Sequence, residues 1–197
     1  MNSPQLTLPR RGDALVMVDL QRDYLPGGVL EVPHGDQVIE ALNRHATQFD
    51  KLGLPVFVAR DWHPVNHASF QELGGHWPPH CMAGTHGAEL PQSLHLPASA
   101  QVLSKGVQPE SDGRSAFDNT HLAALLRRHG ARRVFIGGLS TDDCVSTTAL
   151  DALREGFEVV LLVDAIRTVD TRPGDTARAM AQLRKRGAQL AHLDQAA

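Results

Sequence analysis

Cysteine is scarce in this chain, and its scarcity excludes one class of protein at once. The 197 residues include only Cys81 and Cys144, too few for the disulfide framework of a small secreted domain. The opening segment, MNSPQLTLPRRGD, also lacks the apolar stretch of a secretory signal. We therefore expect two free thiols and a cytoplasmic protein.

Long apolar runs and an excess of positive charge are also missing. The longest apolar runs, 14–20 and 157–163, are far short of the roughly 20 residues of a membrane span. The formal net charge of −3 and the pI near 6.4 provide no basic face for a phosphate backbone. We expect no membrane and no nucleic-acid partner, and therefore a small-molecule substrate. A homo-oligomer is compatible with the sequence.

The sequence alternates between strand-like and helix-like segments. Apolar segments rich in β-branched residues, typical of strands covered on both faces, lie at 14–20, 55–60, 133–138 and 158–164, with shorter ones at 101–104 and 189–192. Helical periodicity covers 36–52, 119–129, 142–155 and 174–186. This alternation predicts an α/β fold, a three-layer sandwich with a central, mostly parallel sheet of about six strands and helices on both faces. Ligands of such sheets bind beyond the carboxyl ends of the strands.

The segment 61–96 interrupts the alternation and is predicted to be an irregular insert with a function. It is dense in histidine, and Asp61 and His63 at the end of a strand would point to the same side. His80 would complete a set of one carboxylate and two imidazoles, which suits zinc, iron or manganese. The alternative is that these histidines are solvated or capping groups of a loop.

Cys144 follows a buried strand, where a helix is expected to begin near Thr141 or Asp142. Unpaired N–H groups and the positive end of the helix dipole favour a thiolate at such a position. The alternative is an inert buried cysteine, which is common among free thiols. An activated thiol also needs a base from elsewhere in the chain.

Two charged residues close strands at the same predicted edge of the sheet. Asp19 follows an apolar run, a poor place for a carboxylate unless it is paired or catalytic. Lys105 closes the short strand near 102–106. Either residue would also suit a structural ion pair. Their expected convergence with Cys144 in one crevice favours a catalytic role.

Short motifs occur in a fixed order along the chain and carry a family resemblance. They are VDLQRDY at 18–24 with PGG at 26–28, DWHPVNHASF at 61–70, WPPHC at 77–81, SKG at 104–106, SAF at 115–117 and GLSTDDCV at 138–145. In this order they resemble the nicotinamidase/pyrazinamidase branch of the isochorismatase-like cysteine hydrolases. The D-W-H motif together with W-P-P-H-C is typical of the metal-binding members.

The resemblance implies a single isochorismatase-like hydrolase domain over residues 1–197, with a metal-binding insert at about 61–96. Its implied reaction is metal-assisted hydrolysis of nicotinamide, and of pyrazinamide-like aromatic amides, to the acid and ammonia through a cysteine thioester. This is the chemistry of a hydrolase acting on linear amide C–N bonds. NAD salvage and pyridine nucleotide biosynthesis would be its setting.

The resemblance also implies a role for each matching residue. Asp19 would be the general base, Lys105 the catalytic lysine and Cys144 the nucleophile. One divalent metal ion, zinc before iron or manganese, would be held by Asp61, His63 and His80, with His67 either a ligand or an outer-shell group. Substrate would meet Tyr24 and Trp77, which sandwich the pyridine ring, and the non-proline cis peptide bond Leu139–Ser140. The N–H groups of Ser140 and Cys144 would form the oxyanion hole.

Two positions depart from the family pattern and bear on substrate preference. Asp143 precedes the nucleophile where an aromatic residue or histidine is usual, and it would raise the pKa of Cys144 if it faced the site rather than solvent. Arg114 replaces a frequent tyrosine, and its guanidinium would stack on an aromatic ring or pair with Asp112.

Other functions are compatible with some of these motifs. Another amidase of the superfamily, acting on a carbamoyl or maleamate-type substrate, would use the same catalytic residues but generally lacks the metal set. An isochorismatase would not need Cys144, and a nucleotide-binding Rossmann protein would need a glycine-rich turn after its first strand. A catalytically silent domain would keep the fold and the metal site but would not catalyse a reaction.

Overall fold

The computed structural model describes residues 5–6, 8–170 and 172–192. Its centre is one sheet of seven strands in the order β1-β7-β6-β5-β2-β3-β4, and every neighbouring pair is parallel. The strands are β1 (Gln5–Leu6), β2 (Asp13–Val18), β3 (Val56–Asp61), β4 (Gln101–Lys105), β5 (Arg133–Gly138), β6 (Glu158–Ile166) and β7 (Gln189–His192). The α/β prediction is confirmed, and the short β1 adds a strand to the expected six.

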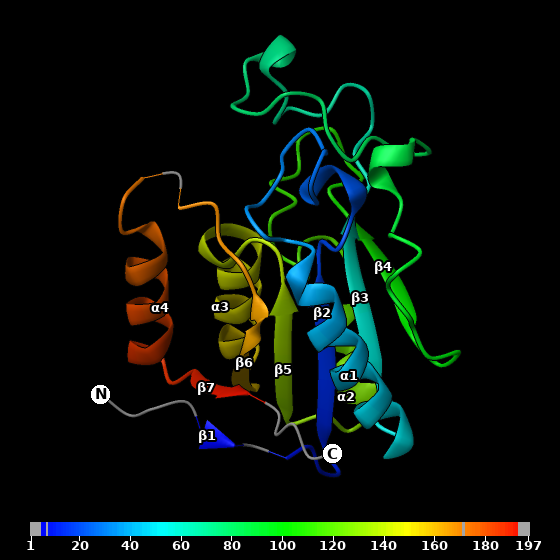
Figure 1. Cartoon of the computed structure of the whole chain (residues 1–197), viewed down its shortest axis with the longest axis vertical. Coiled ribbons are helices and arrows are strands. Elements are labelled where there is room, and N and C mark those ends of the chain that lie inside the picture. The colour runs from blue at the N-terminus through cyan, green and yellow to red at the C-terminus, as the bar shows by residue number, and fades with distance from the viewer. Residues whose placement is uncertain (1–4, 7, 171, 193–197) are drawn as a thin grey trace.

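Helices cover both faces of the sheet, as predicted (Figure 1). They are α1 (Gln37–Lys51), α2 (Leu122–Arg128), α3 (Ser146–Arg154) and α4 (Asp175–Lys185). The core divides into two clusters because successive strand residues point to opposite faces. Leu15 and Met17 of β2 join the cluster that includes α1, whereas Val16 and Val18 join the cluster that includes residues of α2, α3 and α4. Among the described residues, none of the helices is long and apolar enough to cross a membrane.

The long connection between β3 and β4 lies over the carboxyl ends of the strands, at the top of Figure 1. It contains only two short 3₁₀ turns, η2 (Gln71–Leu73) and η3 (His86–Ala88). Two isolated β-bridges, between His63 and Met82 and between Phe70 and Trp77, join separate parts of this connection. The predicted irregular insert is therefore present, and it covers the edge at which parallel sheets bind ligands.

Strand order places a switch point at β2. The chain proceeds from β2 to β3 and β4 on one side and then crosses to β5 on the other side of β2. Residues that follow β2, β3, β4 and β5 therefore meet at one edge of the sheet. Asp19, Asp61, Lys105 and the turn after Gly138 all lie at or directly after these strand ends.

Candidate active site

Lys105 contacts two buried carboxylates and a buried thiol at the carboxyl edge of the sheet. Its ammonium donates hydrogen bonds to Oδ1 of Asp61 at 2.7 Å, to the carbonyl of Gly113 at 2.8 Å and to Sγ of Cys144 at 3.7 Å. The same nitrogen lies 2.9 Å from Oδ2 of Asp19 and forms a buried ion pair with it.

Asp19 is therefore buried next to a cation and next to the thiol of Cys144. Its carboxylate is 1% exposed, and both of these neighbours lower its pKa through side-chain hydrogen bonds. Burial and the carboxylate of Asp61 raise the pKa of Asp19 to about 7, although Lys105 lowers it. A group with a pKa near the working pH is suited to general base catalysis.

The resting state of Cys144 differs from the sequence expectation. Burial raises the pKa of Cys144 well above its usual value, and Asp19 raises it further, while Lys105 lowers it. The structure therefore favours the thiol over the expected thiolate, because the cost of burying an anion beside carboxylates exceeds the help from one ammonium. Cys144 lies in a π-helical turn, η4 (Thr141–Val145), that precedes α3. The thiol therefore needs a base to remove its proton before it can act as a nucleophile.

Asp61, His63 and His80 form the candidate metal centre. Each offers a ligand atom, and these atoms lie within 4.8 Å of one another. Nδ1 of His63 lies 3.0 Å from the carbonyl of Gly106, and Nδ1 of His80 lies 2.8 Å from the carbonyl of Pro78. Metal-binding histidines commonly use one ring nitrogen in this way, which leaves the other free for the ion.

The environment of His63 also fits a metal ligand. Burial lowers the pKa of His63 to about 4, so its ring is neutral at pH 7, as ligation requires. Gly106 leaves room for this ring, because a Cβ at that position would lie 2.4 Å from Cε1 of His63. The requirement explains the glycine after Lys105, a signal in the S-K-G motif that the sequence interpretation did not use.

His67 lies beside this centre but outside the set of three. Its ring centroid is 4.0 Å from that of His63, and its Nδ1 lies 2.7 Å from Oγ of Ser69. Its Nε2 is buried and has no hydrogen-bond partner among the described residues. A buried imidazole nitrogen without a partner is costly in free energy unless it meets an ion or water. This orphaned atom supports a cation in the cluster.

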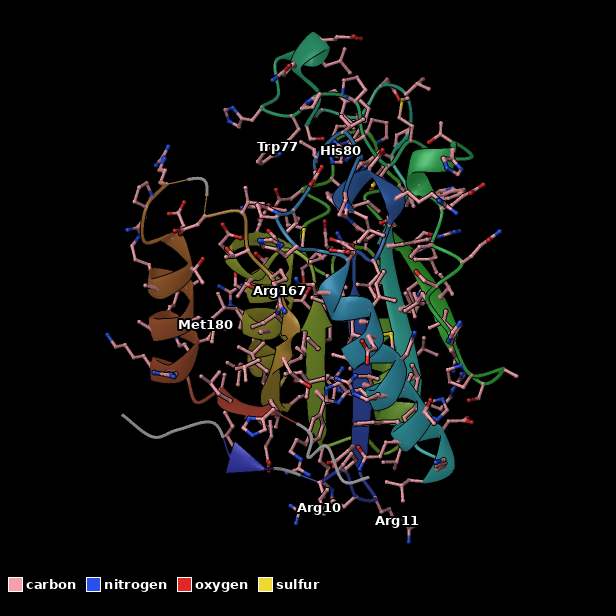
Figure 2. The ribbon with its side chains drawn as sticks, viewed as in Figure 1. Arg10, Arg11, Trp77, His80, Arg167 and Met180 are labelled. Carbon is pink, nitrogen blue, oxygen red and sulfur yellow. The ribbon has the colours of Figure 1, made fainter. Side chains whose placement is uncertain are left out.

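A cavity of about 970 Å³ opens onto both groups of residues. Its walls include Tyr24 and Trp77, the predicted ring contacts, together with Ser140 and Cys144. The hydroxyl of Tyr24 donates a hydrogen bond of 2.5 Å to Oδ2 of Asp61, which fixes the orientation of its ring. Trp77 is 39% exposed and lies with His80 in the insert above the sheet (Figure 2).

The turn before Cys144 contains the expected cis peptide bond, Leu139–Ser140. Ser140 lines the cavity. The side chain of Leu139 is fully buried in the core cluster of α1. Its predicted substrate role therefore concerns its peptide bond and not its side chain.

The two departures from the family pattern meet at the wall of the cavity. The Nε atom of Arg114 donates hydrogen bonds of 3.0 and 2.9 Å to the carboxylate of Asp112, as one of the sequence alternatives proposed. Nη1 of Arg114 lies 3.6 Å from Oδ1 of Asp143. Burial raises the pKa of Asp143, and Arg114 lowers it. Asp143 therefore faces the cavity and is paired there.

The carbonyl of Gly113 is a functional group that the sequence interpretation missed. It accepts a hydrogen bond from Lys105. A Cβ on Gly113 would lie 2.9 Å from the Cα of Gly106, so the close approach of this loop to the end of β4 depends on a glycine at position 113. That glycine was the available signal in the sequence.

A cysteine, a carboxylate and a buried lysine at the carboxyl edge of a parallel sheet are arranged as in the active site of an α/β hydrolase. The chain matches the isochorismatase domain over residues 13–195, and it belongs to that family. A nicotinamidase of Escherichia coli (strain K12) is 38% identical to this chain in an alignment that covers 90% of this chain and 93% of the relative.

Solved structures agree with this membership. The pyrazinamidase of Pyrococcus horikoshii in complex with zinc has a TM-score of 0.88 and 44% identity, covering 92% of this chain and 99% of that one. PnC1 from L. infantum in complex with nicotinate has a TM-score of 0.87 and 39% identity, and the match covers 95% of this chain and 96% of that one. The family resemblance inferred from the motifs is confirmed.

Proposed function

We propose that the protein hydrolyses nicotinamide to nicotinate and ammonia, and that pyrazinamide-like aromatic amides react in the same way. The observation that carries the proposal is that Asp19 and Cys144 line one cavity beside the Asp61, His63 and His80 cluster, with the buried Lys105 in contact with both. Relatives named nicotinamidase support the choice of amide. Residues 1–197 act as one hydrolase domain in this proposal, and NAD salvage in the cytoplasm is its setting.

The first half-reaction transfers the acyl group to sulfur. Asp19 takes the proton of the Cys144 thiol, and the sulfur attacks the carboxamide carbon. The N–H groups of Ser140 and Cys144 stabilise the oxyanion, and each such donor lowers a barrier by about 3 kcal/mol. Asp19 returns the proton to the leaving nitrogen, the C–N bond breaks, and ammonia leaves a thioester on Cys144.

The second half-reaction restores the enzyme. Asp19 takes a proton from a water molecule, the hydroxide oxygen attacks the thioester carbon, and the C–S bond breaks to give nicotinate. The proton returns to sulfur. Lys105 stays protonated throughout, because the nearby carboxylates of Asp19 and Asp61 outweigh the effect of burial and hold its pKa well above the usual value. It offsets the negative charge that develops on sulfur and oxygen.

The candidate metal centre would position the substrate. Asp61, His63 and His80 would hold one divalent ion, with His67 at its side. Zinc is our choice, because imidazole and carboxylate ligands suit it and a zinc complex exists among the similar structures. When bound, the ion would supply a Lewis-acid contact for the ring nitrogen of the amide. Tyr24 and Trp77 would hold the faces of the ring.

Cys144→Ala tests the proposal. The variant is expected to release no ammonia from nicotinamide while keeping the wild-type unfolding temperature and metal content, because it loses only the nucleophile. Thr47→Ala is the control, since Thr47 is exposed in α1 and its hydroxyl bonds only the carbonyl of Asn43, away from the cavity. Turnover near the wild-type level in Cys144→Ala would contradict a thioester intermediate. A wild-type protein that does not hydrolyse nicotinamide would contradict the choice of substrate.

A further inference from the structure

Gln21 is a completely buried polar residue that the proposed reaction does not use. It is 0% exposed and follows Asp19 in the loop after β2. Its side-chain oxygen accepts a hydrogen bond of 2.7 Å from the N–H of Asp61, and its side-chain nitrogen donates one of 2.7 Å to the carbonyl of Asp61. The same nitrogen donates to the carbonyl of Ala88 at 3.0 Å. One amide side chain thus forms hydrogen bonds with both the N–H and the carbonyl of Asp61, a candidate metal ligand.

These bonds continue the sheet where its backbone ladder stops. The last backbone bond from the β2 side runs from the N–H of Asp19 to the carbonyl of Ala59. Beyond it, β2 has turned away, and Gln21 supplies the donor and acceptor that a further strand residue would have supplied. The end of β3 is thereby fixed in the strand conformation, so the direction of the Asp61 side chain is fixed as well.

Asp23, which follows closely in the same loop, has a corresponding role in the insert. It is 9% exposed, and its Oδ2 accepts a hydrogen bond of 2.7 Å from the N–H of Cys81, the residue after His80. The carbonyl of Cys81 in turn accepts a bond of 3.0 Å from the N–H of His63. Gly87 packs on the Asp23 carboxylate so closely that a Cβ would lie 2.3 Å from both oxygens. Asp23 therefore fixes the backbone next to two further candidate ligands.

We propose that Gln21 and Asp23 are positioning residues that preorganise the metal centre from outside its ligand set. Gln21 holds Asp61, whereas Asp23 holds the His80–Cys81 segment and, through Cys81, His63. Neither side chain is among those that line the cavity, so neither is assigned a direct contact with substrate. The inference rests on the proposed metal site. Outer-shell partners of this kind typically contribute about 10- to 100-fold to metal affinity.

Zinc affinity of the full-length protein tests the inference directly. Gln21→Met keeps the shape of the side chain but removes its hydrogen bonds, and the dissociation constant for zinc, measured by competition with a chromophoric chelator, is expected to rise about 10- to 100-fold. Asp23→Ala is expected to do the same. Asp23→Asn keeps an oxygen for the Cys81 N–H and is expected to restore most of the affinity.

Asn43→Leu is the matched control. Asn43 also uses both ends of an amide side chain on backbone groups, accepting from the N–H of His95 and donating to the carbonyl of Ser93, each at 2.8 Å, but its contacts lie outside the site. This variant is expected to keep the wild-type zinc affinity, whatever its unfolding temperature. If Gln21→Met does not fold, Gln21→Glu is measured in its place with the same expectation, because it keeps an acceptor for the N–H of Asp61 but faces the carbonyls of Asp61 and Ala88 with an oxygen instead of a donor.

The outcomes separate this inference from the proposed function. Unchanged zinc affinity in the Gln21 and Asp23 variants, with only a lower unfolding temperature, would overturn the inference and leave the proposed reaction intact. A wild-type protein that binds no zinc would overturn the metal site itself. Weakened zinc binding in these variants but not in Asn43→Leu supports the positioning role.

Discussion

Lys105 and Asp19 form an ion pair in which neither side chain is more than 1% exposed, with Nζ 2.9 Å from Oδ2. The same ammonium also contacts Asp61, the carbonyl of Gly113 and Cys144. Lys105 lowers the pKa of Asp19, whereas burial and Asp61 raise it to about 7. The carboxylate is therefore stabilised by charge and still able to accept a proton near neutral pH.

The pH dependence of turnover reports the ionisation of Asp19. Its pKa is raised to about 7, and the proposed base must be ionised. We expect kcat/KM for nicotinamide to rise about tenfold per pH unit below pH 7 and to level off above it. Steady-state ammonia release between pH 5 and 9, with the stability of the enzyme checked at each pH, measures this. A profile that is flat between pH 5 and 7 would contradict Asp19 as the base.

Lys105→Met removes the cation from between two buried carboxylates. We expect a loss of stability of about 3–5 kcal/mol, because Asp19 and Asp61 are left without their shared partner. Activity is expected to fall at least 100-fold, and any residual pH profile should shift to higher pH, because Lys105 lowers the pKa of Asp19. Denaturant unfolding and ammonia release check these effects.

The control for this change is Lys51→Met, which alters an exposed lysine at the end of α1. Adding Asp19→Asn to Lys105→Met should recover some of the stability, since one unpaired charge is gone, but none of the activity. A stable and active Lys105→Met would place the lysine outside the mechanism.

Removal of the metal is expected to weaken substrate binding and to lower the unfolding temperature. The histidine cluster then loses the partner that its free ring nitrogens require, and any ligand of the native state stabilises it by mass action. A chelator-treated sample, freed of chelator, should have a raised KM that returns to normal when zinc is added. Full activity in a verified metal-free sample would reduce Asp61, His63 and His80 to structural roles.

Arg114→Tyr is expected to change the choice among amides. Arg114 lines the cavity and pairs with Asp112 and Asp143, so its removal alters both the width and the charge of that wall. The ratio of kcat/KM for nicotinamide to that for bulkier aromatic amides measures the effect, with the exposed Arg132→Tyr as control. An unchanged ratio would show that Arg114 does not shape substrate preference.

Most of the fold was predictable because the central strands are buried on both faces. The apolar runs at 14–20 and 133–138 became β2 and β5, whose residues are all buried. The strand that was not predicted, β1 (Gln5–Leu6), is only two residues long, and such a short segment carries no periodicity. The π-helical turn at Thr141–Val145 was also invisible, because its residues fit an ordinary first helical turn.

The site was predictable where residue type carried the signal. Asp19, Lys105 and Cys144 are chemically distinctive and lie at strand ends, where a parallel sheet gathers them. Gln21 and Asp23 gave no such signal, because their partners Asp61 and Cys81 lie 40 and 58 positions away in the sequence. The protonation of Cys144 was mispredicted for a related reason, since its pKa depends first on the burial of the thiol and then on the charged groups that the fold brings to it.

Asp61 is shared between the nucleophile's surroundings and the candidate metal centre, bonding Lys105 with one oxygen and Tyr24 with the other. Replacing this aspartate would therefore remove a candidate metal ligand and at the same time deprive Lys105 of one of the two carboxylates beside it. A variant without this ligand would need another acidic side chain beside the ammonium to balance its charge.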